Sequence, residues 1–117
     1  MKQRVLGKTG RLVSQIGLGT WQLGTRWGDP FNRAEAMKIL ETADAHGIAF
    51  VDTADVYNDG KSEETIGEYL SAHPGCFYVT SKCGRRLNPH TAEMYTPEAV
   101  AGFIEGSLRA CSWSGWT

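Results

Sequence analysis

The feature that most constrains this chain is a repeated alternation between short apolar segments and segments whose apolar residues recur at helical spacing. The apolar segments are residues 16–21, 48–51 and 77–81, and a helical pattern follows each of them. Because short continuous apolar runs are typical of buried strands, this order predicts parallel strands joined by right-handed helical crossovers. Residues 3–14 precede them as two short strands around a glycine-containing turn. We therefore expect an α/β fold that begins with a hairpin and continues with three βα units.

Capping residues mark where the expected helices begin and end. Asn32 is a suitable N-cap with Glu35 at capping-box spacing, and Gly47 ends this first helix. The second helix is expected to begin at Ser62, and the third to follow Thr96 as its N-cap. The third helix carries its apolar residues on one face, namely Val100, Phe103, Ile104 and Leu108.

The composition excludes several classes of protein. At 117 residues, with 41% hydrophobic and 21% charged residues, the chain is one globular domain or part of a larger one. A formal net charge of −1 gives no reason to expect nucleic acid or a membrane surface as a partner, and no apolar run approaches the roughly 20 residues of a membrane span. The three cysteines lack Cys-x-x-Cys spacing, which predicts a reducing, cytoplasmic location. The three histidines lack metal-ligand spacing, so we expect no metal site.

Polar residues end each of the three predicted strands. Thr20, Asp52 and Lys82 are 32 and 30 positions apart, which is close to one βα unit each. All three should therefore face one rim of the sheet, and Tyr57 follows Asp52 on the adjoining loop. Ligands and catalytic groups collect at this carboxyl end in α/β folds.

An aspartate, a tyrosine and a lysine on one rim suit proton donation to a carbonyl oxygen. A free phenol has a pKa near 10 and is a poor acid at neutral pH, but a nearby lysine favours the phenolate. Asp52 would orient Lys82 and keep it charged, so that Tyr57 acts as general acid while a cofactor supplies hydride to carbon. Each residue also has a structural alternative: Asp52 as the cap of a turn, Tyr57 as a half-buried loop aromatic, and Lys82 as a solvated strand end.

A dinucleotide-binding glycine fingerprint is absent from the first predicted strand. Gly17 and Gly19 fit its first two positions, but the third would be position 22, which is Gln22. We therefore interpret these glycines as sites where backbones approach closely or the strand bends.

Several motifs together resemble one family, the aldo-keto reductases. In chain order they are Val5–Gly10, Ile16–Trp21, Asp52–Tyr57, Ser62–Gly67 and Thr80–Lys82. The resemblance extends from about Arg4 to Arg109. It implies a (β/α)8 TIM barrel whose base is plugged by the N-terminal hairpin, so residues 1–117 would be a partial, incomplete aldo/keto reductase domain.

The resemblance also implies an activity and a set of site residues. The family members are oxidoreductases that reduce aldehydes or ketones to alcohols with NADP(H), which makes a small carbonyl compound the expected substrate. The catalytic roles fall on Asp52, Tyr57 and Lys82, with Tyr57 as proton donor. Thr20, Trp21 and Asp52 would lie near the nicotinamide of the cofactor.

The chain also departs from the family pattern. The family's fourth catalytic residue, a histidine that ends the fourth barrel strand, has no counterpart here. The residues with which the family binds its cofactor lie largely in the second half of the barrel. We therefore expect this chain alone to be inactive, and the alternatives are a non-catalytic binding or regulatory module or a non-functional truncated product. Residues 110–117 fit no family pattern and are interpreted as an atypical or out-of-frame tail. Open strand edges predict self-association.

Overall fold

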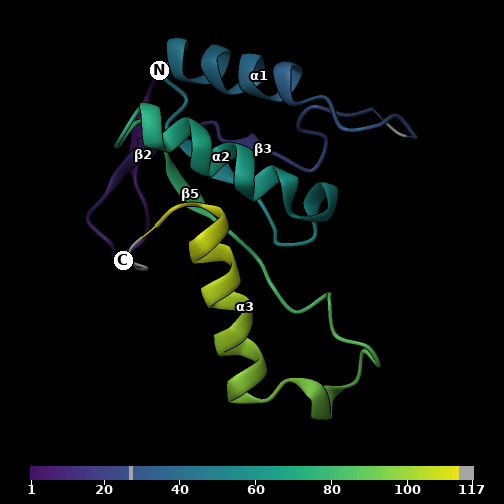
Figure 1. Cartoon of the computed structure of the whole chain (residues 1–117). Helices are drawn as coiled ribbons and strands as arrows, with labels where there is room; N and C mark the ends of the chain where they lie inside the picture. Colours follow the sequence, from purple (N-terminus) through teal and green to yellow (C-terminus); the bar gives the residue numbers. More distant parts are fainter. Residues whose placement is uncertain (27, 114–117) are drawn as a thin grey trace.

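The computed structural model of the chain describes residues 1–26 and 28–113 (Figure 1). Its elements are β1 (Gln3–Val5), β2 (Leu12–Ser14), β3 (Leu18–Gly19), α1 (Arg33–Ala45), β4 (Phe50–Asp52), η1 (Tyr57–Gly60), α2 (Lys61–Ala72), β5 (Tyr78–Thr80), η2 (Ala92–Met94) and α3 (Pro97–Ala110), where η denotes a 3-10 helix. The predicted order of hairpin, strands and helices is confirmed. Of the tail predicted at 110–117, residues 114–117 lie outside the described residues.

The hairpin is antiparallel and is fastened to the main sheet. Arg4 pairs with Val13 across the two strands, and Gly10 takes a φ of 72° in the turn. The Ser14 hydroxyl then accepts a hydrogen bond from the backbone N–H of Ala49 at 2.9 Å. Since Ala49 precedes β4 directly, this bond fixes the amino end of that strand to the hairpin.

The main sheet is parallel with the order β3-β4-β5. Val51 pairs with Leu18 on one side and with Val79 on the other, as the predicted crossovers require. β3 is shorter than the apolar run 16–21 that predicted it. Gly17, which precedes β3, confirms the interpretation as a close approach, because a Cβ there would lie 2.8 Å from the ring of Phe50 and 3.2 Å from its carbonyl oxygen. Gly19 does not, because a Cβ there would meet nothing within 4 Å.

The hydrophobic core lies between the sheet and the two helices α1 and α2, which run side by side in Figure 1. Val51 of β4 contributes from the sheet, Leu40 from α1 and Ile66 from α2, and all three are fully buried. Side chains alternate along a strand, so Phe50 points to the opposite face, where its ring stacks on that of Tyr78 at 6.1 Å between centroids. One face of the sheet therefore carries the core and the other carries an aromatic pair.

Helix α3 is formed as predicted but is only partly packed. The Thr96 hydroxyl accepts a hydrogen bond from the N–H of Ala99 at 3.2 Å, which confirms it as the N-cap. The apolar face of α3 is only partly covered: Val100, Phe103 and Leu108 are of intermediate burial and Ile104 is 38% exposed, and Ser107 is the buried residue of the helix. Figure 1 shows that α3 approaches α2 at its C-terminal end, where Cys111 is fully buried.

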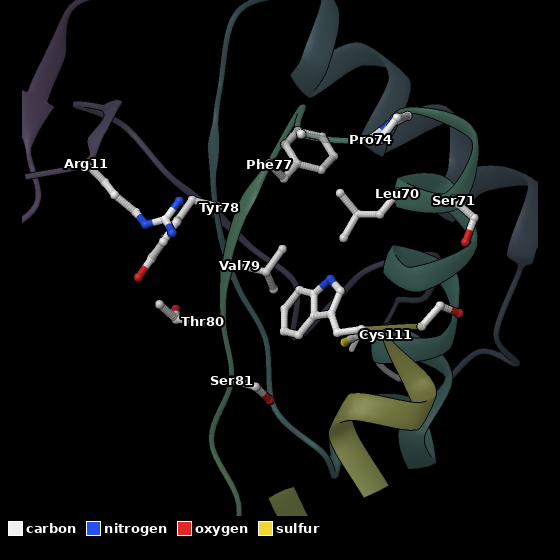
Figure 2. Close-up of a pocket in the computed structure, with 13 residues that line it drawn as sticks. Arg11, Leu70, Ser71, Pro74, Phe77, Tyr78, Val79, Thr80, Ser81 and Cys111 are labelled. Atoms are coloured by element: carbon white, nitrogen blue, oxygen red, sulfur yellow. The ribbon is translucent and has the colours of Figure 1, made fainter. Parts of the chain in front are cut away.

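β5 is an edge strand in the described part of the chain, and a cavity of about 490 Å³ lies beside it (Figure 2). Leu70 of α2, together with Phe77 and Val79, lines its apolar side, and Arg11 and Tyr78 lie across the strand (Figure 2). Among the described helices, none is long and apolar enough to cross a bilayer.

Candidate active site

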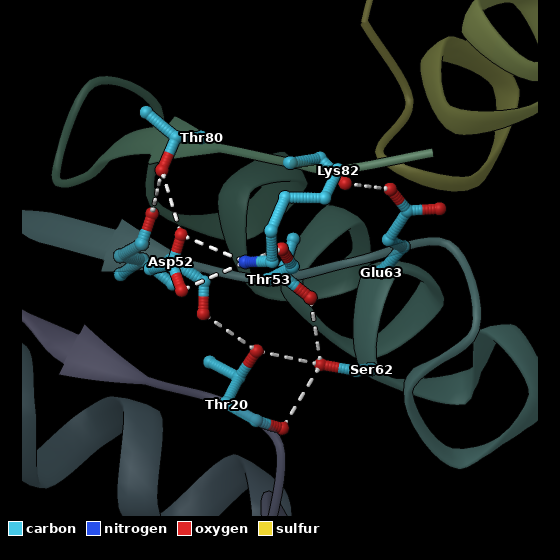
Figure 3. Close-up of polar contacts among 9 residues, drawn as sticks. Thr20, Asp52, Thr53, Ser62, Glu63, Thr80 and Lys82 are labelled. Atoms are coloured by element: carbon cyan, nitrogen blue, oxygen red, sulfur yellow. Dashed lines mark hydrogen bonds and ion pairs between the residues drawn. The ribbon is translucent and has the colours of Figure 1, made fainter. Parts of the chain in front are cut away.

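The carboxyl end of the parallel sheet gathers the polar residues predicted from the sequence (Figure 3). Asp52 is the last residue of β4, Lys82 lies just beyond β5, and Thr20 follows β3 directly. Lys82 Nζ donates to both carboxylate oxygens of Asp52, at 2.9 Å to Oδ1 and 2.8 Å to Oδ2. The predicted contact between Asp52 and Lys82 is therefore present.

Lys82 is held by a third acceptor and remains accessible. Its Nζ also donates to the backbone carbonyl of Thr53 at 2.6 Å, while its side chain is 50% exposed. Burial lowers the pKa of Lys82, but the hydrogen bonds and negative charge of Asp52 outweigh it, with smaller contributions from Tyr57, so the pKa lies above its ordinary value. Lys82 is thus a fixed positive charge at neutral pH.

Tyr57 begins the 3-10 helix η1 and lies next to this charge. Lys82 Nζ lies over the Tyr57 ring, 5.1 Å from its centroid. The loop turns through Asn58 and Asp59, whose φ values of 50° and 55° are left-handed, a conformation that these two residue types tolerate best after glycine. The Asn58 amide donates to the carbonyl of Leu23 at 3.0 Å, which anchors the tyrosine loop to the loop after β3.

The residues predicted near the nicotinamide differ in their exposure. Thr20 is fully buried, and its N–H and hydroxyl both donate to the backbone carbonyl of Asp52, at 3.0 Å and 3.1 Å. Trp21, the next residue, is 57% exposed, and the Asp52 side chain is 48% exposed. A ligand on this rim would therefore meet Trp21 and Asp52, whereas the Thr20 side chain lies beneath them.

Sequence reasoning missed a set of buried polar residues beneath the rim. Ser62 is fully buried and its hydroxyl lies 2.9 Å from that of Thr20. Glu63 is 2% exposed and accepts a hydrogen bond from the Ser81 hydroxyl at 2.6 Å. Ser62 and Glu63 were interpreted as the start of a helix and as part of a family motif, and their spacing carries no signal for contacts with strand ends that are distant in the sequence.

Arg86 adds a second positive charge near the tyrosine loop. Its guanidinium donates to the backbone carbonyl of Asp55 at 2.5 Å and to the carboxylate of Asp59 at 3.1 Å. These bonds brace η1 from the side of the loop that follows β5. In the described residues no group of three His, Cys, Asp or Glu side chains is placed to hold a metal ion.

The fold and the rim together define a class: a parallel βα protein with a lysine, a carboxylate and a phenol at the carboxyl ends of its strands. The family model for the aldo/keto reductase family matches residues 15–114. The chain belongs to this family, as its sequence motifs predicted.

Relatives support the same assignment over most of the chain. Pyridoxal 4-dehydrogenase from Microbacterium luteolum is 35% identical over 98 residues, which is 84% of this chain and 28% of that protein. The NADH-specific methylglyoxal reductase of Escherichia coli is 37% identical over 87 residues, 72% of this chain and 27% of that protein.

Solved structures confirm the fold class. An aldo-keto reductase from Bacillus halodurans in its holo form superposes with a TM-score of 0.77 at 27% identity, covering 97% of this chain and 37% of that one. An aldo-keto reductase from Klebsiella pneumoniae in complex with NADPH gives a TM-score of 0.68 at 27% identity, covering 89% of this chain and 33% of that one. The chain thus spans roughly a third of these barrels. The hairpin and three βα units are part of a TIM barrel.

Proposed function

We propose that the protein reduces a small aldehyde or ketone to an alcohol with NADP(H), and that Tyr57 donates the proton to the carbonyl oxygen. One observation carries this proposal: Lys82 Nζ is fixed by both oxygens of Asp52 and lies over the Tyr57 ring on an accessible rim. The cluster brings a proton donor and a positive charge to the carboxyl ends of the strands, where substrates bind in barrels of this type.

The positive charge favours loss of the phenolic proton. As Tyr57 gives its proton to the carbonyl oxygen, negative charge develops on the phenol beside the Lys82 ammonium, which stabilises it. The Asp52 carboxylate holds that ammonium in place and raises the pKa of Lys82, so the charge persists at neutral pH. When bound, the nicotinamide cofactor would supply the hydride to the carbonyl carbon.

The rim is suited to the nicotinamide end of the cofactor. The exposed Trp21 indole offers an apolar surface, and Asp52 offers a half-exposed carboxylate on the adjacent strand. NADP(H) is proposed because the Klebsiella relative is in complex with NADPH. The E. coli relative is called NADH-specific, so both reduced cofactors belong in the test.

The proposed activity is that of a whole enzyme, to which these residues contribute the proton-donating side of the site. The chain spans 27–28% of the length of the two relatives and about a third of the two barrels. We propose a small carbonyl compound as substrate. Because β3 and β5 are the edge strands of the sheet within residues 1–26 and 28–113, we also propose self-association of the isolated chain.

Two measurements on the purified chain test the proposal. NADPH and NADH binding are followed by fluorescence, and turnover of a simple aldehyde is followed by loss of reduced cofactor. Where turnover is found, Tyr57→Phe should reduce kcat by about 10²- to 10⁴-fold, the usual contribution of a general acid, with cofactor binding unchanged. Tyr78→Phe is the matched control, because Tyr78 lies on β5 against Phe50, and should change neither.

The outcomes separate the proposed enzyme from its alternatives. Cofactor binding without turnover would favour a non-catalytic module of the same fold. Absence of binding to both cofactors would exclude catalysis by the 117-residue chain. Turnover that survives Tyr57→Phe would remove Tyr57 as the proton donor.

A further inference from the structure

Three buried hydroxyl groups form a chain beneath the candidate active site (Figure 3). Thr20, Thr53 and Ser62 are each fully buried, and they come from the ends of two strands and the first turn of α2. The Ser62 hydroxyl lies between the other two, 3.0 Å from that of Thr53 and 2.9 Å from that of Thr20. The Thr20 hydroxyl continues the chain to the backbone carbonyl of Asp52 at 3.1 Å.

The proton of each hydroxyl can be assigned along this chain. A hydroxyl has a single proton to donate, and the Asp52 carbonyl can only accept. Thr20 therefore donates to Asp52, and its oxygen accepts the proton of Ser62. Ser62 has then no proton left for Thr53, so Thr53 donates to Ser62. All three groups are satisfied in one direction, and removal of the central hydroxyl would leave two of them short of a partner.

The hydroxyl chain begins and ends on the two residues that hold Lys82. Thr53 starts it and Asp52 ends it, and these neighbours supply the three acceptors of the Lys82 ammonium: two carboxylate oxygens and one backbone carbonyl. The backbone conformation at Asp52 and Thr53 therefore helps to decide whether all three acceptors point at Nζ, because the carboxylate stands on Asp52 and the accepting carbonyl belongs to the peptide between Thr53 and Ala54. The Ser62 hydroxyl bonds directly to the Thr53 hydroxyl and reaches the Asp52 carbonyl through the Thr20 hydroxyl, so its effect on Lys82 is indirect.

We propose that Ser62 is a positioning residue, which acts through Thr20 and Thr53 to fix the acceptors of the Lys82 ammonium. For catalysis the inference rests on the proposed function, since it deepens the role of the Asp52–Lys82 pair. The geometric part, that the Ser62 hydroxyl controls how firmly Lys82 is held, does not depend on turnover. An effect of the Ser62 hydroxyl on how firmly Lys82 is held would distinguish Ser62 from a buried hydroxyl that only satisfies its own hydrogen bonds.

The test follows the Lys82 ammonium directly by NMR on the chain labelled with ¹⁵N-lysine. Exchange of the ammonium protons with water is measured at mildly acidic pH, with Lys82→Arg used to assign the signal. Ser62→Ala should speed exchange at Lys82 by about 2- to 10-fold, the factor expected when one hydrogen bond is lost. Ser71→Ala is the matched control, because that hydroxyl on the same helix donates only to the carbonyl of Gly67, and should leave the exchange rate unchanged.

A second pair of variants serves if Ser62→Ala does not fold. Thr53→Val removes a hydroxyl and preserves the shape of the side chain, and it should also speed exchange at Lys82. Thr65→Val makes the same change at a buried residue of α2, whose hydroxyl donates to the carbonyl of Lys61. This control should leave the exchange rate at Lys82 unchanged. Thr53→Ser, which keeps the hydroxyl, should restore slow exchange.

The results separate this inference from the proposed function. Faster exchange in Ser62→Ala or Thr53→Val, with both controls unchanged, supports the positioning role even if no cofactor binds. Equal exchange rates in the folded variants and their controls would overturn it, even if the chain binds NADPH. Where turnover is measurable, Ser62→Ala should lower kcat and leave KM for the cofactor unchanged, whereas a fall in folded fraction alone would lower kcat in proportion to the folded protein.

Discussion

Helices α2 and α3 carry comparable apolar faces, yet the structure uses them differently. Ile66 of α2 is fully buried against the sheet and α1, whereas Ile104 of α3 is 38% exposed. α3 is attached chiefly at its C-terminal end, where Cys111 is buried beside Gly67. An amphipathic pattern therefore specifies a helix, whereas the elements that pack against its apolar face decide how much that face stabilises the fold.

The largest effect expected from this comparison is the loss of unfolding free energy when the core isoleucine of α2 is truncated. Ile66→Ala should lower the free energy of unfolding by about 2–5 kcal/mol, because it leaves a cavity in the core. Ile104→Ala, the same substitution on α3, should cost less, about 1 kcal/mol, since the residue is already 38% exposed and its removal leaves no closed cavity. Urea unfolding followed by circular dichroism measures both, and equal losses would contradict the contrast between the two helices. If Ile66→Ala does not fold, Ile66→Val should still cost about 0.5–1.5 kcal/mol.

Two helical glycines test the attachment of α3 itself. A Cβ on Gly67 would lie 2.4 Å from the carbonyl oxygen of Ala110, so Gly67→Ala must displace the end of α3 and should cost about 1–3 kcal/mol. A Cβ on Gly102 of α3 meets nothing within 4 Å, so Gly102→Ala should stabilise the helix by about 0.5–1 kcal/mol. The same unfolding experiment gives both values. A neutral Gly67→Ala would show that α3 does not pack on α2 in solution.

The smallest effect is a dependence of stability on alkaline pH. Burial raises the pKa of the Cys111 thiol to about 12 from an ordinary value of 9.0, and the charge of Glu63 adds to this. A raised folded-state pKa means that the stability is fully present below pH 9 and is lost as the pH rises toward 12. By pH 10 the loss through Cys111 should be about 1 kcal/mol, so Cys111→Ala should show a flatter decline between pH 8 and 10. Identical declines of stability with pH in the parent chain and in Cys111→Ala would show that the Cys111 thiol is exposed to water.

Much of the fold could be predicted because its signals are local. Asn32 and Thr96 cap helices through residues three positions away, and alternation of apolar segments with helical patterns specifies parallel strands. The same alternation placed Asp52 and Lys82 on one rim, since both follow strands that are neighbours in the sheet. The boundaries of β3 were less accurate, because Gly17 lies against Phe50 outside the short paired segment.

The support beneath the site could not be predicted because its contacts are distant in the sequence. Ser62 meets Thr20 across 42 positions, and a serine at the start of a helix is equally expected as a solvent-exposed residue. The burial of Thr20 likewise depends on how β3 and α2 pack. The limited burial of α3 depends on neighbouring elements, which its own apolar spacing does not specify.

The hydrogen bond between Ser14 and Ala49 has a further consequence for β4. This short strand is tied to the hairpin at its amino end and to the hydroxyl chain at its carboxyl end, so it cannot slide along its neighbours. A shift of one residue would exchange the two faces of the strand, turning Val51 toward the rim and the Asp52 carboxylate into the apolar core. The hairpin therefore helps to fix the register of β4. The hydrogen bond between Ser14 and Ala49, at the amino end of the strand, contributes to placing the Asp52 carboxylate where Lys82 can bind it.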